Sequence, residues 1–287
     1  MIALTGAGGF VGSVILGYLN SQGINNVVLF DDLPHGDQFK NLVGKEYSSL
    51  HSTDEIFQDP SRIECVIHVG ANASTLEKDW SRLYLTNVLS TRKWNRFCLD
   101  NNIPFIFTSS AAVYGNGQGP LNHYAFSKLI SENEISGVIL RLFNVYGPNE
   151  YHKGRMASTI YHWHQQLIEN FHLKIFEDSG QYLRDFIYVE DVAKVVYHFI
   201  KNYQPGIYDI GTGTAVSFEN VATELLNNAP GEIIKIKMPD DLKAQYQKHT
   251  CADTSTLKET GFDVKELRSV ERGIKDYTSY LKNLTYY

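Results

Sequence analysis

The segment Thr5-Gly6-Ala7-Gly8-Gly9-Phe10-Val11-Gly12 follows an apolar run at residues 2–4 and precedes a run with helical periodicity. Its glycines at positions 6, 9 and 12 would allow a tight turn, close approach of the backbone to a phosphate and close packing of a helix on a strand. The amides at the start of that helix would attract an anion. The spacing is G-x-x-G-x-x-G and not the dinucleotide fingerprint G-x-G-x-x-G, because position 11 is Val. A glycine turn after a strand is often only a turn, but this one is a candidate for binding the pyrophosphate of a dinucleotide.

Two adjacent acids, Asp31 and Asp32, follow the next apolar run at residues 27–30. A carboxylate at the end of the second strand of a dinucleotide-binding unit accepts hydrogen bonds from the adenosine ribose, and Asp31 has that position. Asp32 adds a second negative charge, and no Lys or Arg follows before Lys40. These charges would repel a 2′-phosphate, so the sequence favours NAD over NADP. The alternative for Asp32 is that its carboxylate only caps the following turn.

The composition is that of a globular enzyme and not of a protein that binds nucleic acid or a membrane. The 287 residues are 43% hydrophobic, and the formal net charge is -6 without a clustered Lys/Arg run. The sequence has no basic leader and no apolar stretch of about 20 residues, so we expect a cytoplasmic protein. Cys65, Cys98 and Cys251 lie far apart without metal-ligand spacing, which predicts free thiols and no metal site.

Short apolar runs alternate with amphipathic ones in the first half of the chain, as in βαβ units on a parallel sheet. After Gly147-Pro148 the pattern changes to longer helical stretches. We therefore predict an α/β protein with a doubly wound parallel sheet for dinucleotide binding at residues 1–145 and a smaller substrate-binding lobe at residues 146–287. Apolar runs at 186–189 and 208–210 indicate that residues 186–211 return to the first unit, so that the two units are interleaved.

Ser110, Tyr124 and Lys128 have the features of a proton-transfer site. Residues four apart share one face of a helix, so Tyr124 and Lys128 can contact the same ligand. A free phenol, with a pKa of about 10, is a poor base at neutral pH, but a neighbouring ammonium and a positive nicotinamide ring favour the phenolate. Ser110 follows a predicted strand at 105–108, at the sheet edge where ligands lie, and can orient a substrate hydroxyl or ketone. The alternative is a surface Tyr beside a solvated Lys, because Y-x-x-x-K is common by chance.

Four segments together resemble the extended short-chain dehydrogenase/reductase family of nucleotide-sugar epimerases and dehydratases. They are 5–12, 108–115, 124–128 and 141–148. The resemblance implies a Rossmann-type sheet and catalysis by Ser110, Tyr124 and Lys128. Dehydratases of this family have Asp-Glu after the catalytic Ser or Thr, whereas this chain has Ala111 and Ala112, which leaves epimerisation or simple oxidation and reduction. The implied cofactor contacts are Gly6, Gly9, Phe10, Val11, Gly12, Asp31, Asp32, Gly70, Ala71, Thr86, Tyr124, Lys128 and Val145.

The segment His152-Lys153-Gly154-Arg155-Met156-Ala157-Ser158 resembles one group in this family more narrowly, the ADP-glycero-manno-heptose 6-epimerases. That group has a second base in its H-K-G-x-M-A-S segment, and Lys153 matches it. The resemblance implies epimerisation at C6 of an ADP-heptose through a transient ketone, with Tyr124 and Lys153 as acid/base groups. The alternative for Lys153 is contact with phosphate or solvent only. The implied substrate contacts are Asn144, Lys153, Arg155, His162, Phe176, Arg184 and Tyr246. Arg184 is favoured for the pyrophosphate because a guanidinium makes bidentate contacts, and His162 and Phe176 are equally compatible with packing.

Some positions differ from that group. The stretch between Ser110 and Tyr124 is shorter, and Arg155 stands where Ser is usual. Gln38 and Thr53 replace lysines expected to bind a 2′-phosphate, which fits the use of NAD. The open alternatives are another nucleotide-sugar epimerase, such as a hexose 4-epimerase, an NAD(P)-dependent ketosugar reductase and an inactive NAD-sensing module. The resemblance also implies a homo-oligomer.

Overall fold

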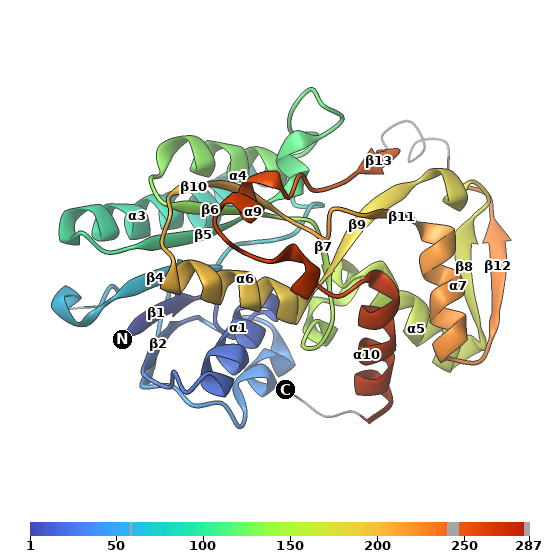
Figure 1. The fold of residues 1–287 in the computed structure, drawn as a ribbon, viewed down its shortest axis with the longest axis horizontal. Coiled ribbons are helices and arrows are strands. Elements are labelled where there is room, and N and C mark those ends of the chain that lie inside the picture. The colour runs from blue at the N-terminus through green and yellow to red at the C-terminus, as the bar shows by residue number, and fades with distance from the viewer. Residues whose placement is uncertain (58, 240–246, 284–287) are drawn as a thin grey trace.

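A seven-stranded parallel sheet forms the centre of the molecule (Figure 1). The computed structural model describes residues 1–57, 59–239 and 247–283. The strand order is β10-β6-β5-β4-β1-β2-β3, so the direction of strand addition reverses between β1 and β4. Such a reversal creates a crevice at the carboxyl ends of the strands, where ligands bind. The strands are β1 (Ile2–Thr5), β2 (Val27–Phe30), β3 (Ser49–His51), β4 (Cys65–His68), β5 (Phe105–Ser110), β6 (Val138–Leu142) and β10 (Gly206–Ile210).

Helices cover both faces of this sheet. On one face, α1 (Phe10–Ser21) packs against α6 (Val189–Lys201), and α9 (Ser255–Glu259) adds Leu257 to the same core. On the other face, α3 (Ser90–Asn101) buries Trp94 with its ring 4.7 Å from that of Phe30, and α4 (His123–Glu134) lies beside α3 (Figure 1). This double cover explains why β1, β2 and β4 are buried along their whole length.

Short helical segments connect these elements. The turn α2 (Trp80–Leu83) continues into a π-helix, η3 (Tyr84–Leu89), which leads into α3. The 3₁₀-helices are η1 (Gly36–Leu42), η2 (Pro60–Arg62), η4 (Ala111–Tyr114), η5 (Tyr151–Met156), η6 (Ser179–Gln181) and η7 (Val264–Glu266).

The second lobe has its own sheets and its own core. In one sheet, β9 (Leu183–Tyr188) pairs with β7 (Asn144–Tyr146), β11 (Ala215–Ser217) and β13 (His249–Thr250). The other sheet pairs β8 (His172–Phe176) with β12 (Glu232–Ile236). Helices α5 (Thr159–Asn170), α7 (Phe218–Asn228) and α10 (Val270–Asn283) complete this lobe, which lies to one side of the central sheet (Figure 1). Its core includes Tyr146, Trp163, Phe186, Val221 and Tyr277.

The α/β class and the Rossmann-type parallel sheet predicted from the sequence are confirmed. One part of the predicted organisation is wrong, because β9, with the apolar run at 186–188, does not return to the central sheet. Strand β6 already has β5 and β10 as its two neighbours, and β7, which follows β6, pairs with β9 instead. Residues 206–210 do join the central sheet as β10. The division into a cofactor unit and a substrate unit remains our interpretation.

The helices and the cysteines of the structure can be compared with what the composition predicts. Within the part of the chain that the structure describes, no helix is long and apolar enough to cross a membrane. The cysteines are free thiols: Cys65 and Cys98 are buried, and Cys251 is partly buried.

Candidate active site

The glycine turn between β1 and α1 is shaped by contacts that exclude side chains. Gly6 has a positive φ of 66°, and a Cβ built on it would lie 2.6 Å from the Gly70 backbone. A Cβ on Gly12 would lie 2.1 Å from the carbonyl oxygen of Gly6. The Gly9 amide donates to the same oxygen at 3.1 Å and closes the turn. The backbone at the start of α1 therefore stays close to the crevice, as phosphate binding by main-chain amides requires.

Asp31 lies against this turn, whereas Asp32 binds a different segment. The Asp31 carboxylate is 9% exposed and accepts hydrogen bonds from the amides of Gly8 (2.9 Å) and Leu33 (2.8 Å). Burial raises the pKa of Asp31, and these two amides oppose the rise. Asp32 accepts hydrogen bonds from the Ser52 hydroxyl (2.8 Å), the Thr53 amide (3.0 Å) and the Thr53 hydroxyl. Asp31 is therefore the acid placed to meet a ligand of the glycine turn.

Tyr124 and Lys128 lie in the first turns of α4, which Asn122 caps by accepting a hydrogen bond from the Ala125 amide at 2.9 Å. The Lys128 ammonium donates to the Thr108 carbonyl at 2.8 Å. Lys128 is only 3% exposed, and burial lowers its pKa to about 7 although Glu132 opposes this shift.

Ser110 ends β5 and contacts Tyr124. Burial raises the pKa of Tyr124, and a hydrogen bond with the Ser110 side chain is the cause that lowers it. The Ser110 hydroxyl also accepts a hydrogen bond from the Ala112 amide at 3.1 Å, which fixes it at the start of η4. Ser110 therefore opposes the effect of burial on Tyr124, and the expected effect of Lys128 together with a nicotinamide ring stays a prediction.

A buried chain of hydrogen bonds joins Thr5, at the start of the glycine turn, to helix α4. The Thr5 hydroxyl pairs with Nδ1 of His68 at 2.7 Å, and Nε2 of His68 pairs with the Thr91 hydroxyl at 3.1 Å. Thr91 donates to the Asn87 carbonyl at 2.6 Å, and the Asn87 amide donates to the Ser127 hydroxyl at 2.9 Å. Burial lowers the pKa of His68 to about 3, so this histidine is neutral.

Sequence reasoning did not find His68, and of the pair Thr86 and Asn87 it named Thr86 as the cofactor contact. Thr86, which the resemblance assigned to the cofactor, is exposed, and its hydroxyl donates to the Arg82 carbonyl at 2.9 Å. Asn87 is buried because the π-helix η3 turns it inward. A helical period of 3.6 residues does not reveal such a turn, so the only available signal was an Asn within an apolar helix.

Lys153 lies at the other side of the glycine turn, in η5. Its ammonium is 4.9 Å from the ring centroid of Phe10, the first residue of α1. Burial lowers the pKa of Lys153, and the charge of Glu150 opposes this shift. Glu150 is fully buried and accepts hydrogen bonds from the amide (2.5 Å) and hydroxyl (2.7 Å) of Ser158. Lys153 is therefore a partly buried amine next to the glycine turn, and its acid/base role stays a prediction.

The remaining implied substrate residues that the structure describes lie in the second lobe or in η5, which connects to it. The Arg184 guanidinium lies 5.6 Å from the Phe218 ring centroid, and Phe218 and Phe176 line a cavity of ≈ 200 Å³. Nε2 of His162 is buried without a hydrogen-bond partner among the described residues. The Asn144 side chain donates to the Asp185 carbonyl at 2.8 Å, and Arg155 is exposed. Tyr246 lies outside the described residues.

The other implied cofactor contacts lie along the carboxyl edge of the sheet. The Gly70 amide donates to the Thr5 hydroxyl at 3.1 Å, and Ala71 follows it, partly buried. Val145 lies in β7, where it pairs with Ile187.

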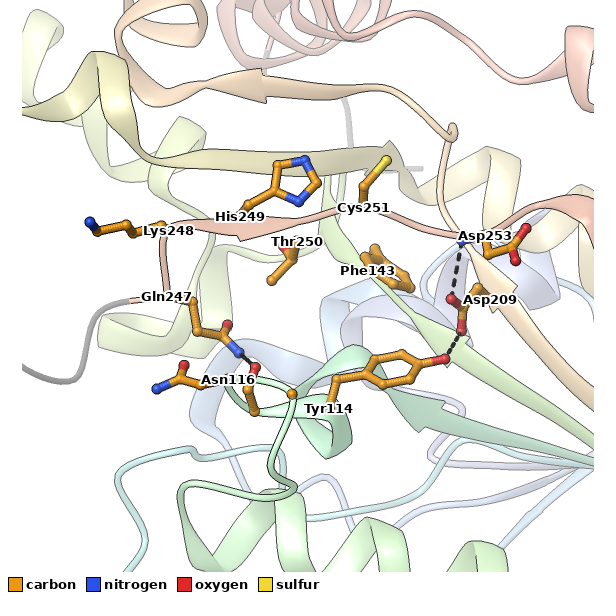
Figure 2. Close-up of a pocket in the computed structure, with 12 residues that line it drawn as sticks. Tyr114, Asn116, Phe143, Asp209, Gln247, Lys248, His249, Thr250, Cys251 and Asp253 are labelled. Carbon is orange, nitrogen blue, oxygen red and sulfur yellow. Dashed lines mark hydrogen bonds between the residues drawn. The ribbon is translucent and has the colours of Figure 1, made fainter.

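A cavity of ≈ 680 Å³ lies between the loop after η4 and the strand segment that contains β13 (Figure 2). Its lining includes Tyr114, Phe143, Asp209, Gln247 and Thr250, but neither Tyr124 nor Lys128. The Tyr114 hydroxyl donates to Asp209 at 2.7 Å, and the Gln247 side chain donates to the Gly115 carbonyl, as Figure 2 shows. Because η4 directly follows Ser110 and β7 directly follows Phe143, this cavity adjoins the site described above. Among the described residues, no group of His, Cys, Asp or Glu could hold a metal ion.

Comparison with known proteins relates the whole chain to sugar-nucleotide enzymes. Residues 2–211 match the family model of the NAD dependent epimerase/dehydratase family. The ADP-L-glycero-D-manno-heptose-6-epimerase of Brachyspira hyodysenteriae is 37% identical over 313 aligned residues, which cover 98% of each chain. The aligned length exceeds the 287 residues of this chain, so that relative has segments that this chain lacks.

Solved structures show the same fold. The ADP-L-glycero-D-manno-heptose-6-epimerase of Helicobacter pylori superposes with a TM-score of 0.82 at 28% identity, covering 98% of this chain and 96% of that one. The UDP-N-acetylglucosamine 4-epimerase of Methanobrevibacter ruminantium has a TM-score of 0.80 at 24% identity, covering 99% and 98% of the two chains, and shows the fold alone.

Proposed function

This chain belongs to the NAD dependent epimerase/dehydratase family, and from that membership we propose that it epimerises C6 of an ADP-activated heptose. The observation that supports this most directly is the partly buried amine of Lys153, which lies beside the glycine turn and is an acid/base candidate in addition to Tyr124. The C6 hydroxyl points to opposite sides in the two epimers, so a second acid/base group can serve the epimer that Tyr124 does not reach. The 37% identical relative, which carries the name of this activity, supports the same substrate class.

The residues present fit a dinucleotide. A Cβ would fill the turn at Gly6 and Gly12, so the backbone there can approach a pyrophosphate. Asp31 lies at the end of β2 beside Gly8, where it can bind the adenosine ribose. Lys128, fixed on Thr108, is placed to bind the nicotinamide ribose. When bound, the dinucleotide accepts a hydride from the sugar and returns it.

The protein's own groups then have distinct tasks. Ser110 orients the oxygen of the C6 carbinol through its hydroxyl, next to Tyr124. One of Tyr124 and Lys153 takes the proton of that hydroxyl when one epimer is oxidised, and the other group gives a proton to the ketone oxygen when the second epimer forms. Burial makes the charged form of each group less favourable. It raises the pKa of the Tyr124 phenol and lowers the pKa of the Lys153 amine. Both shifts favour the neutral forms, in which the amine can accept a proton and the phenol can donate one. The reverse reaction uses the ammonium and the phenolate that these two transfers leave behind.

The proposal is tested by incubating the protein with ADP-D-glycero-D-manno-heptose and following the sugar proton spectrum. We expect the second C6 epimer to appear without net consumption of cofactor. Tyr124→Phe and Lys153→Ala should each lower kcat by roughly 10²–10⁴-fold, the usual contribution of a general acid or base. Lys258→Ala, which removes an exposed amine on α9, serves as the control. If no epimer forms, the heptose assignment is wrong; activity on a hexose nucleotide that survives Lys153→Ala would indicate a 4-epimerase instead.

We also propose NAD as the preferred cofactor. The support is the buried Asp31 beside the turn and the side chains Gln38 and Thr53 where a 2′-phosphate would need a cation. Calorimetric titration with both dinucleotides tests this preference, and tighter binding of NADP would contradict it.

We also propose that the protein forms a homo-oligomer and acts in the cytoplasm. Large apolar side chains are exposed on and near α2, η3 and α4, namely Leu76, Leu85, Leu89, Leu121 and Phe126. Covering such side chains stabilises an assembly. Sedimentation of the protein would show whether it associates.

A further inference from the structure

Asn41, the second-last residue of η1, connects two segments that are far apart in the sequence. Its side chain is fully buried. The side-chain nitrogen donates to the carbonyl of Gly8 at 3.0 Å and to the carbonyl of Asn149 at 3.3 Å, and it lies 3.3 Å from Nδ1 of His152. Because it faces two carbonyl oxygens, this atom is the amide nitrogen and not the oxygen.

The segments that Asn41 joins carry the two halves of the proposed site. Gly8 belongs to the glycine turn, and its amide binds Asp31 at 2.9 Å. Residues 149–152 directly precede Lys153. Two further hydrogen bonds hold the same segment in place: the Asn149 side chain donates to the Ser13 hydroxyl at 3.0 Å, and the Tyr151 hydroxyl donates to the Asp37 carbonyl at 3.2 Å. The segment before Lys153 is thus attached to both η1 and α1.

The oxygen of the Asn41 amide has no hydrogen-bond partner among the described residues, although it is buried. Burying an acceptor without a donor costs free energy. An apolar residue would avoid this cost if the position only filled space, but it would remove the donor shared by Gly8 and Asn149. The amide nitrogen of Asn41 therefore serves to connect the Gly8 and Asn149 carbonyls.

We propose that Asn41 is a positioning residue that holds Lys153 in register with the cofactor-binding glycine turn. This inference rests on the proposed function, because it takes Lys153 as one of two acid/base groups. Lys153 must stand within hydrogen-bond reach of the sugar carbinol, while the glycine turn fixes the dinucleotide against which that carbinol lies. A side chain that contacts both segments sets the distance between them.

Single-turnover oxidation of each C6 epimer by the holoenzyme, followed by the absorbance of reduced nicotinamide, separates the two bases. Lys153→Ala identifies the epimer whose oxidation depends on the amine. Asn41→Ala should slow oxidation of that epimer by roughly 10–100-fold, the effect expected of a small misplacement, and leave oxidation of the other epimer unchanged. Asn41→Asp keeps the shape of the side chain and places a carboxylate against two carbonyls, so it should have the same selective effect even if the Ala variant folds poorly.

Gln38→Ala is the matched control. Gln38 is also buried in η1, but its side chain bonds to Asp31 at 3.4 Å and to the His35 amide at 3.3 Å. We expect this variant to affect both epimers equally, through cofactor binding. If the Asn41 variants slow both epimers equally, or neither, the inference is wrong.

A second readout does not depend on the substrate. The pKa of Lys153 can be measured by NMR titration of methylated lysines, with Lys153→Ala to assign the signal. Loosening of the segment in Asn41→Ala should expose the amine and raise its pKa, and an unchanged pKa would overturn the inference. If the unaltered protein oxidises neither epimer, the proposed function fails, and the titration still decides the role of Asn41.

Discussion

Lys128 has a structural cost that follows from its position. It is 3% exposed, its ammonium is 4.6 Å from the ring centroid of Phe107, and burial lowers its pKa from 10.5 to about 7. The unfolded chain would keep the proton up to the ordinary pKa of a lysine. A neutral Lys128 amine would avoid repulsion with the positive nicotinamide ring while it binds the neighbouring ribose. The charged ammonium, in contrast, opposes folding because it is buried.

The Lys128 pKa predicts how stability depends on pH. Between about pH 7 and pH 10.5 the unfolded state binds this proton and the folded state does not, so the contribution of Lys128 to stability rises with pH in that window. We expect Lys128→Met to remove this rise. The difference in unfolding free energy between the variant and the unaltered protein should favour the variant most near pH 7, and it should shrink as the pH approaches 10.5. Thermal unfolding of cofactor-free protein across this range measures the effect. Lys258→Met, at an exposed position, should follow the unaltered protein at every pH, and a parallel curve for Lys128→Met would contradict the prediction.

Single residues differ in how far the sequence reveals them. Tyr124 and Lys128 could be predicted because a spacing of four places both on one helical face, and Asp31 because it ends a strand. His68 and Asn41 could not, since a His at a strand end and an Asn near the end of a short 3₁₀-helix have no pattern of their own. Their tasks depend on which distant segments they touch, Thr5 and Thr91 for His68, and Gly8 and Asn149 for Asn41.

At the scale of the element, α1 contains two glycines with opposite constraints. A Cβ on Gly12 would lie 2.1 Å from the Gly6 carbonyl oxygen, which belongs to the backbone and cannot move without opening the turn. A Cβ on Gly17 would meet only the end of the Lys45 side chain, at 3.3 Å. The first glycine serves the turn, whereas the second only weakens the helix.

We therefore predict opposite effects of the same substitution on one helix. Gly12→Ala should destabilise the protein and weaken binding of the dinucleotide, because the turn must open to admit the methyl group. Gly17→Ala should stabilise the protein by about 0.5–1 kcal/mol, the helix propensity difference between Ala and Gly. Denaturant unfolding and cofactor titration of both variants measure these effects. Equal stability of the two variants would show that the contact at Gly12 does not constrain the turn.

The elements themselves were predictable to different degrees. Six strands of the central sheet could be recognised because burial on both faces requires continuous apolar runs. The edge strand β3 was not predicted, because it is short and none of its residues is fully buried. The placement of β9 could not be predicted, because Phe186, Ile187 and Tyr188 are apolar in either sheet. Their sheet is determined by the pairing of β9 with β7. The π-helix η3 was equally hidden, since one extra residue in a turn leaves no mark in composition.

At the scale of the whole molecule, the proposed substrate must reach from one lobe to the other. Tyr124 and Ser110 belong to the central sheet and its helix α4, whereas Arg184 lies in β9 of the second lobe. Arg184 is 7% exposed, and its guanidinium lies over Phe218, which lines a cavity together with Phe176. In the proposed function, the nucleotide therefore binds at Arg184 in the second lobe, whereas the sugar reacts at Ser110 and Tyr124 beside the central sheet.

This separation predicts that Arg184→Ala changes binding of the nucleotide and not of the cofactor. Loss of a hydrogen bond to a charged group costs about 1.5–3 kcal/mol, so affinity for ADP should fall by roughly 10–100-fold. The affinity for the dinucleotide should remain, because the glycine turn lies in the other lobe. Calorimetric titration with ADP and with NAD measures both. Arg272→Ala removes the same charge from an exposed position on α10 of the same lobe and should change neither affinity. If Arg184→Ala binds ADP as tightly as the unaltered protein, the nucleotide lies elsewhere, and the cavity beside Tyr114 and Thr250 becomes the next site to test.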